Sequence, residues 1–258
     1  MPLAHEERYA LAERLCARYA EATEAVLVGG LYGSTARGAD TLWSDLELLF
    51  VVRDGSGARG FAALYAGTAI GATVMEESKL LRQIQCPSTG WPMQMAILED
   101  LHVLQGDASL PARWLEIGRA TPRALHMQAL EAALPGLVFE SCGRIYSCRQ
   151  RDNRHDLHVS VVETLLEMNT ALCLLNGSWV HHDYYDGIED VFHFDKLPEG
   201  YRELAPALWD SRNPAEAAAL AERLLGSFVA LLRAEGVTMT DWAELPPERW
   251  PLAPRRAI

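Results

Sequence analysis

Residues 29–52 read GGLYGSTARGADTLWSDLELLFVV, and this stretch decides the fold of the chain. The segment 25–32, AVLVGGLY, is apolar and carries β-branched residues. A turn-rich loop, GSTARGADTLWS, separates it from the segment 45–52, DLELLFVV, which alternates between polar and apolar at its start and is wholly apolar at its end. This pattern predicts two neighbouring strands of one sheet.

The loop and the second strand carry the residues of a candidate phosphate and metal site. Gly33 and Ser34 open a turn whose backbone N–H groups and hydroxyl can close on phosphate oxygens, because glycine lets the main chain approach a ligand. Asp45 comes eleven residues after Ser34, and Glu47 follows at i+2, so the period of two places both carboxylates on one face of the sheet. Two hard oxygen ligands beside a polyphosphate are typical of Mg²⁺. Arg37, on the same loop, is a candidate partner for a further phosphate.

The competing interpretation of this stretch is a glycine-rich hairpin followed by a strand whose Asp and Glu face water. A GS turn alone carries little information. The combination of GS, eleven residues and DxE on a strand that then turns fully apolar is much rarer than either part. It favours the phosphate and metal site.

The rest of the first half predicts further elements of an α/β unit that ends near residue 120. Apolar residues at helical spacing predict a first helix over 5–23. The run 53–60 reads as a loop. We expect a third strand over 69–75, a short helix over 76–84, and a fourth strand with its following turn over 93–104.

From Pro122 onward, leucines and alanines recur at spacings of three and four, which predicts an all-helical second half. Pro135 and Gly136 either kink one long helix or separate two. A long apolar-faced helix over 155–177 ends at Gly177, and a helix that Asn213 and Pro214 begin ends before Gly236. The predicted domains are therefore 1–120 and 121–258.

Composition narrows the class of protein. The chain has 258 residues, of which 49% are hydrophobic, so it can bury a large core. Lys and Arg number 23 against 35 Asp and Glu, and the net charge of −12 disfavours a nucleic-acid partner. The five cysteines form no CxxC pair, and no signal peptide or membrane span stands out. We expect a cytoplasmic protein with reduced thiols and no membrane partner.

The string GSTARG followed by SDLELLFVV resembles the signature of the nucleotidyltransferase superfamily that contains DNA polymerase β. Within it the chain resembles the aminoglycoside 4'-O-nucleotidyltransferases, which also have similar strings to FESCGR (139–144), HHD (181–183) and KLPEGYREL (196–204). The resemblance implies an α+β fold: an N-terminal polymerase β-like mixed sheet with flanking helices, and a C-terminal all-helical domain. It also implies transfer of AMP from Mg-ATP to the 4'-hydroxyl of an aminoglycoside antibiotic, with release of pyrophosphate and inactivation of the drug.

The resemblance implies roles for further residues. The family's general base is a glutamate in a helix of the C-terminal domain, followed four residues later by a lysine on the nucleotide phosphates. Those positions are Glu140 and Arg144 here, and the i, i+4 spacing places both on one helix face. An exposed salt bridge is the alternative. The family's acidic residue on the third strand is absent, which leaves Glu76 and Glu77 just past that strand as candidate substrate contacts, or as ordinary first-turn acids.

The resemblance also implies a homodimer in which the partner subunit completes each active site in the cleft between the domains. His181 and His182 lie in an aromatic-rich loop and read as packing or dimer-contact residues rather than metal ligands. Two other functions remain open. One is a nucleotidyltransferase that acts on another small hydroxyl compound or on a protein side chain. The other is a non-catalytic nucleotide-binding relative, which the presence of both Asp45 and Glu47 disfavours.

Overall fold

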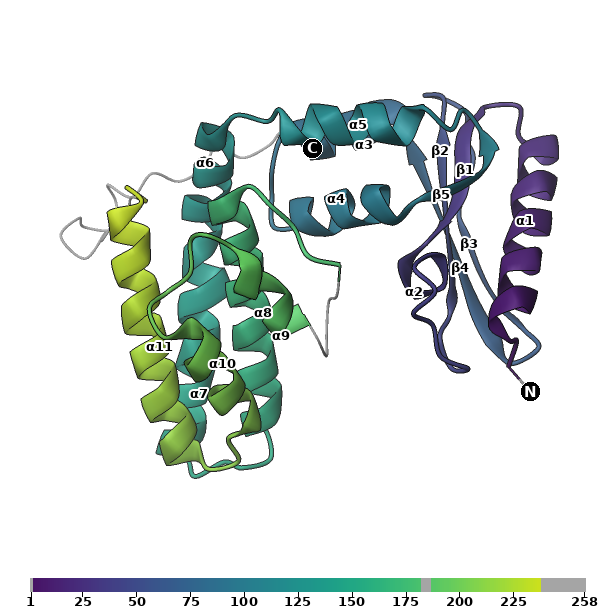
Figure 1. The fold of residues 1–258 in the computed structure, drawn as a ribbon. Coiled ribbons are helices and arrows are strands. Elements are labelled where there is room, and N and C mark those ends of the chain that lie inside the picture. Colours follow the sequence, from purple (N-terminus) through teal and green to yellow (C-terminus); the bar gives the residue numbers. More distant parts are fainter. Residues whose placement is uncertain (1, 182–186, 238–258) are drawn as a thin grey trace.

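The computed structural model describes residues 2–181 and 187–237. A five-stranded mixed sheet with helices on both faces is followed by a group of helices (Figure 1). The strands are β1 (Val26–Tyr32), β2 (Leu46–Val52), β3 (Phe61–Tyr65), β4 (Thr68–Glu76) and β5 (His102–Gly106). Their order across the sheet is β3-β4-β2-β1-β5, with β2 and β4 parallel and the other neighbours antiparallel. This confirms the predicted α+β class.

Strand β2 is buried on both faces, which explains its apolar end. Leu48 and Phe50 belong to the core beneath α1 (His5–Ala22). Leu49 and Val51 point to the other face, where the core includes residues of α3 (Glu77–Gln85), α4 (Trp91–Asp100) and α5 (Leu110–Arg119). By the alternation of a strand, Glu47 lies on the same face as Leu49 and Val51.

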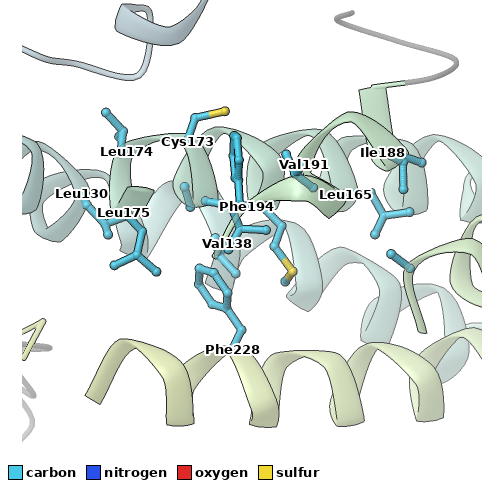
Figure 2. Close-up of a cluster of buried hydrophobic side chains, with 14 of the residues drawn as sticks. Leu130, Val138, Leu165, Cys173, Leu174, Leu175, Ile188, Val191, Phe194 and Phe228 are labelled. Carbon is cyan, nitrogen blue, oxygen red and sulfur yellow. The ribbon is translucent and has the colours of Figure 1, made fainter. Parts of the chain in front are cut away.

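The second half is helical from Arg123. It contains α6 (Arg123–Leu134), the π-helix η1 (Pro135–Glu140), α7 (Ser141–Gln150), α8 (Leu157–Asn176), α9 (Gly187–Asp190), the 3₁₀-helix η2 (Val191–His193), α10 (Tyr201–Asp210) and α11 (Pro214–Ala234). Figure 2 shows Phe228 projecting from α11 toward Val138 of η1 in the centre of this core. The core is continuous with the one beneath α3, α4 and α5.

Helix α8 has the length and mean hydropathy, 1.2, of a membrane span. It is nevertheless the central helix of this half, and 61% of that span is buried inside the protein. The helix ends at Gly177, which adopts the left-handed conformation (φ 60°) that glycine tolerates best. The predicted end of this helix is thus confirmed.

One prediction about local structure is wrong, and one strand is not predicted. The segment 93–104 is not one strand, because 91–100 forms α4 and only 102–106 form β5. A helix forms here for two reasons. Proline is favoured at the start of a helix, where Pro92 lies, and the buried side chains recur at helical spacing: Trp91, Met95 and Leu98. Strand β3, for which no element is predicted, has all five residues exposed at the edge of the sheet and so lacks a burial pattern.

Of the two predicted outcomes for Pro135, separation into two helices is wrong. The chain continues from α6 through the π-helical turn η1 into α7. Proline lacks an N–H and its ring crowds the preceding turn of an α-helix, and a wider π-turn accommodates both. At the other end of this half, the Asn213 side chain accepts hydrogen bonds from the N–H groups of Ala215 and Glu216, which confirms the predicted N-cap of α11.

Candidate functional site

The turn between β1 and α2 (Gly33–Ala36) brings Gly33 and Glu47 into close contact. Gly33 has a positive φ of 74°, and a Cβ built on it would lie 2.0 Å from Oε2 of Glu47. Only glycine allows this backbone conformation and this approach at once. The half-buried Glu47 therefore lies directly over the turn, and the exposed Asp45 immediately precedes the same strand. Glu47 thus lies beside the turn that contains Gly33, as the sequence predicts, and Asp45 is close enough to Tyr32 for its charge to raise the pKa of that residue.

Tyr32 and Thr73 complete the surroundings of Glu47. Tyr32 pairs with Glu47 across β1 and β2, and its hydroxyl hydrogen-bonds to the side chains of both Glu47 and Thr73. Burial and the nearby charge of Glu47 raise the pKa of Tyr32, so its hydroxyl stays protonated and donates. Tyr32 thereby orients the carboxylate. The only sequence signal for this role is the place of Tyr32 at the end of the strand, next to Gly33.

The loop from Arg37 to Asp45 is fixed to α1 by a buried ion pair. Arg8, whose side chain is 1% exposed, contacts the carboxylate of Asp40 and donates to the carbonyl oxygens of Thr41 and Leu42 at 2.7 and 2.8 Å. Burial pushes the pKa of Asp40 up, but the hydrogen bonds and charge of His5 and Arg8 outweigh it and hold that pKa below its usual value. The loop that leads to Asp45 is therefore held in place.

Arg37 and Ser34 lie at the same turn. Ser34 is half-buried in α2, and Arg37 directly follows this short helix. The guanidinium of Arg37 forms an ion pair with Asp100 at the end of α4. Its Nε is buried and has no hydrogen-bond partner among the described residues, but 25% of the side chain is exposed, so a ligand can reach part of Arg37.

Glu76 and Glu77 lie at the other end of the sheet. In the parallel pair β2 and β4, Glu47 is opposite Gly71 whereas Glu76 is opposite Val52, about 17 Å along the strand at 3.3 Å per residue. Glu76 accepts a hydrogen bond from the N–H of Gly55 at 2.8 Å, and Glu77 accepts one from the indole of Trp114 at 3.2 Å. The structure does not bring these two glutamates together with Asp45 and Glu47.

Glu140 and Arg144 share one face of a helix, as their spacing predicts. Their side chains form an ion pair with 3.0 Å between Nη2 and Oε1, and Arg144 also contacts Glu163 of α8. Hydrogen bonds to Glu163 and Glu140 raise the pKa of Arg144 above its usual value. In Figure 1, α7 and α8 lie in the helical half of the protein, and α2 lies beside the sheet.

The candidate metal ligands are Asp45 and Glu47. Among residues 2–181 and 187–237, no group of three or more His, Cys, Asp or Glu is placed to hold a metal ion. A cation at the turn would therefore take two carboxylates from the protein and the rest of its shell from phosphates and water. This donor set fits Mg²⁺, and a carboxylate has enough lone pairs for Glu47 to bind it while still accepting from Tyr32.

Comparison with known proteins supports the fold. No protein-family model matches the chain, and no curated protein matches it. Among solved structures, the chain is similar to a nucleotidyltransferase-like protein from Exiguobacterium sibiricum 255-15, with a TM-score of 0.51 and 15% sequence identity. The match covers 87% of this chain and 74% of that one. The chain thus has a nucleotidyltransferase-like fold.

Proposed function

We propose that the protein is a nucleotidyltransferase that transfers AMP from Mg-ATP to a hydroxyl group of an aminoglycoside antibiotic. The observation that carries the proposal is the contact between Gly33 and Glu47, with Asp45 beside it. The left-handed Gly33 makes room for the carboxylate of Glu47 near the start of β2, and this places an oxygen ligand at a turn whose backbone N–H groups can bind phosphate.

The residues of the turn have separable tasks in this reaction. Asp45 and Glu47 hold Mg²⁺, which when bound neutralises charge on the triphosphate. The hydroxyl of Ser34 and the guanidinium of Arg37 bind phosphate oxygens, and the absence of a side chain at Gly33 makes room for the carboxylate of Glu47 beside them. Tyr32 keeps the carboxylate of Glu47 directed at the turn.

Glu140 is the proposed general base. The acceptor oxygen attacks the α-phosphorus, the bond from this phosphorus to the bridging oxygen breaks, and pyrophosphate leaves. Glu140 takes the proton of the acceptor hydroxyl, and Arg144 balances charge on the phosphates. Both side chains are solvent-accessible, with 62% of Glu140 and 47% of Arg144 exposed, so they are available to a ligand.

A homodimer with shared active sites is part of the proposal. A second subunit that presents its Glu140 to the turn of the first would complete the site, as the resemblance to the aminoglycoside nucleotidyltransferases implies. The net charge of −12 suits a cationic acceptor, and a cytoplasmic location supplies ATP.

The direct test is pyrophosphate release from Mg-ATP with and without kanamycin or tobramycin, followed by mass spectrometry of the drug. We expect release only with the drug present, and a drug heavier by one AMP residue. Release with another hydroxyl compound or with a protein acceptor would replace the substrate and keep the reaction. Binding of Mg-ATP without any transfer to a broad acceptor panel would instead indicate a nucleotide-binding protein.

A further inference from the structure

The last turn of α4 carries two carboxylates at a place where they are electrostatically unfavourable. Glu99 and Asp100 lie at the C-terminal end of the helix, toward which the peptide dipoles point their negative ends, and that turn contains no basic residue. Basic residues from three other segments of the chain balance the negative charges of these two carboxylates. Arg37 follows α2, Arg119 ends α5, and His181 lies in the loop after α8.

Asp100 connects two of these segments through one carboxylate. One of its oxygens contacts the guanidinium of Arg37, and the other lies 3.0 Å from Nδ1 of His181. The side chain of Asp100 is 8% exposed, so water screens these contacts weakly. The contact with Nδ1 is not aligned as a hydrogen bond, so the interaction between the two groups is electrostatic.

Glu99 holds His181 from the opposite side. Its Oε2 lies 3.1 Å from Nε2 of His181 and accepts a hydrogen bond of 2.7 Å from the indole of Trp179. Its Oε1 accepts one of 2.8 Å from Arg119, whose guanidinium lies 5.3 Å from the centre of the Trp179 ring. The imidazole of His181 is thus fixed between two carboxylates.

We propose that His181 is a positioning residue that acts through Asp100 on Arg37 and so adjusts the affinity for nucleotide. This inference rests on the proposed function, in which Arg37 binds phosphate. Phosphate oxygens and Asp100 compete for the same guanidinium. His181 engages the second oxygen of Asp100, which weakens the hold of Asp100 on Arg37 and lowers the negative potential that the phosphates meet. Without His181, Asp100 retains Arg37 more strongly and nucleotide binds less well.

The test is a double-mutant cycle on the binding of Mg-ATP, measured by calorimetry without an acceptor. We expect His181→Ala to weaken binding about tenfold in the wild-type background, within the usual range of coupling between sites. In the Asp100→Asn background the same substitution should change binding less than about twofold, because the carboxylate through which it acts is gone. His181→Gln, which keeps a polar side chain without a charge, replaces His181→Ala if the latter fails to fold.

Trp179→Phe is the matched control. It keeps the ring beside Arg119 and removes only the N–H that Glu99 accepts, so it loosens the same loop without touching Asp100. We expect binding of Mg-ATP to change less than about twofold. A loss equal to that of His181→Ala would show that docking of the loop, not the charge on Asp100, matters.

Two further results would overturn the inference. If His181→Ala weakens binding equally in both backgrounds, His181 does not act through Asp100, and the proposed function stands unaffected. If wild-type protein does not bind Mg-ATP at all, both the inference and the proposed function fail. Unfolding curves of each variant, recorded before calorimetry, confirm that the proteins compared are folded.

Discussion

Oε2 of Glu47 lies so close to the α-carbon of Gly33 that a Cβ there would come within 2.0 Å of it. The space at the turn that a side chain would fill is occupied by the carboxylate. Gly38, four residues on from Ser34, also has a positive φ, 68°, but a Cβ there would meet nothing within 4 Å. A substitution at Gly38 therefore introduces backbone strain alone, whereas the same substitution at Gly33 also displaces Glu47.

We predict that Gly33→Ala abolishes nucleotide transfer while Gly38→Ala largely preserves it. Each substitution places a Cβ in the left-handed region at a cost of about 1–2 kcal/mol, so both should lower the melting temperature similarly. Glu47 can swing away from a new Cβ at Gly33, and this limits the loss of stability but removes the ligand from the turn. Calorimetric unfolding and pyrophosphate release measure the two effects. Equal activities of the two variants would contradict the assignment.

Asp45→Asn should nearly abolish turnover and leave the fold intact. The substitution keeps the shape of an exposed side chain and removes a charged ligand of Mg²⁺, whose stabilisation of the reaction is worth several kcal/mol, or on the order of 10²-fold or more in kcat. Unfolding curves and pyrophosphate release at a range of Mg²⁺ concentrations test it. Near wild-type activity of the folded variant at every Mg²⁺ concentration would disprove the metal assignment.

The sequence predicts the parts of the fold in which local signals agree with burial. The strand ending at Tyr32, the glycine turn and the buried strand from Leu46 are all found, because a strand buried on both faces is apolar throughout. Strand β3 is not predicted, because an edge strand that is exposed at every residue shows no alternation of buried and exposed positions. The sequence predicts a strand over 93–104, where residues up to Asp100 are helical, because a short buried helix is as apolar as a buried strand.

The candidate site is predicted only where its residues are close in sequence. Gly33, Asp45 and Glu47 are joined by a hairpin, so their proximity follows from local geometry. The pairing of Arg37 with Asp100, 63 residues away, depends on how α4 packs on the sheet and leaves no local signal. For the same reason the sequence predicts that Glu140 and Arg144 share a face but does not reveal that Glu163 joins them.

Arg8→Ala should destabilise the protein by about 3–5 kcal/mol, since it leaves the carboxylate of Asp40 buried without its main cation. His5→Ala is the matched control. His5 contacts the same carboxylate with a side chain that is 48% exposed, and its loss should cost less than about 1 kcal/mol. Urea unfolding measures both. A smaller loss for Arg8→Ala than for His5→Ala would contradict the anchoring role of Arg8.

The ion pair of Arg8 and Asp40 predicts that the protein loses stability in acid. Because the pKa of Asp40 in the folded protein lies below its usual value of 3.8, ionised Asp40 stabilises the fold fully above that value. The contribution disappears as the pH falls through the lower, folded-state pKa. Asp40→Asn should therefore show a smaller change in unfolding free energy than wild type between pH 5 and the acid limit of the measurement, at about pH 2. Identical pH profiles would exclude this role.

Glu140→Gln should lower kcat on the order of 10²-fold or more, the usual range for a lost general base, with little change in Mg-ATP affinity. Glu163→Gln is its control, because Glu163 contacts the same guanidinium of Arg144 without an assigned catalytic role. We expect a change of less than about fivefold there. Equal losses in both variants would show that the glutamates position Arg144. A higher KM with kcat preserved would make Glu140 a substrate-binding residue.

Mixing two inactive variants decides whether the site is shared between subunits. After subunit exchange between Asp45→Asn and Glu140→Gln protein, a mixed dimer with sites formed across subunits has one site with both carboxylates intact and one with neither. Random exchange makes half of the dimers mixed, so activity should recover to about one quarter of wild type. If each subunit forms its site alone, every site lacks one carboxylate and no activity returns. Analytical ultracentrifugation confirms that the exchanged species is a dimer. Recovery is the expected result, because the proposed site takes Glu140 from the partner subunit. A mixture without activity would return Glu140 to its own subunit's site or exclude it as the base.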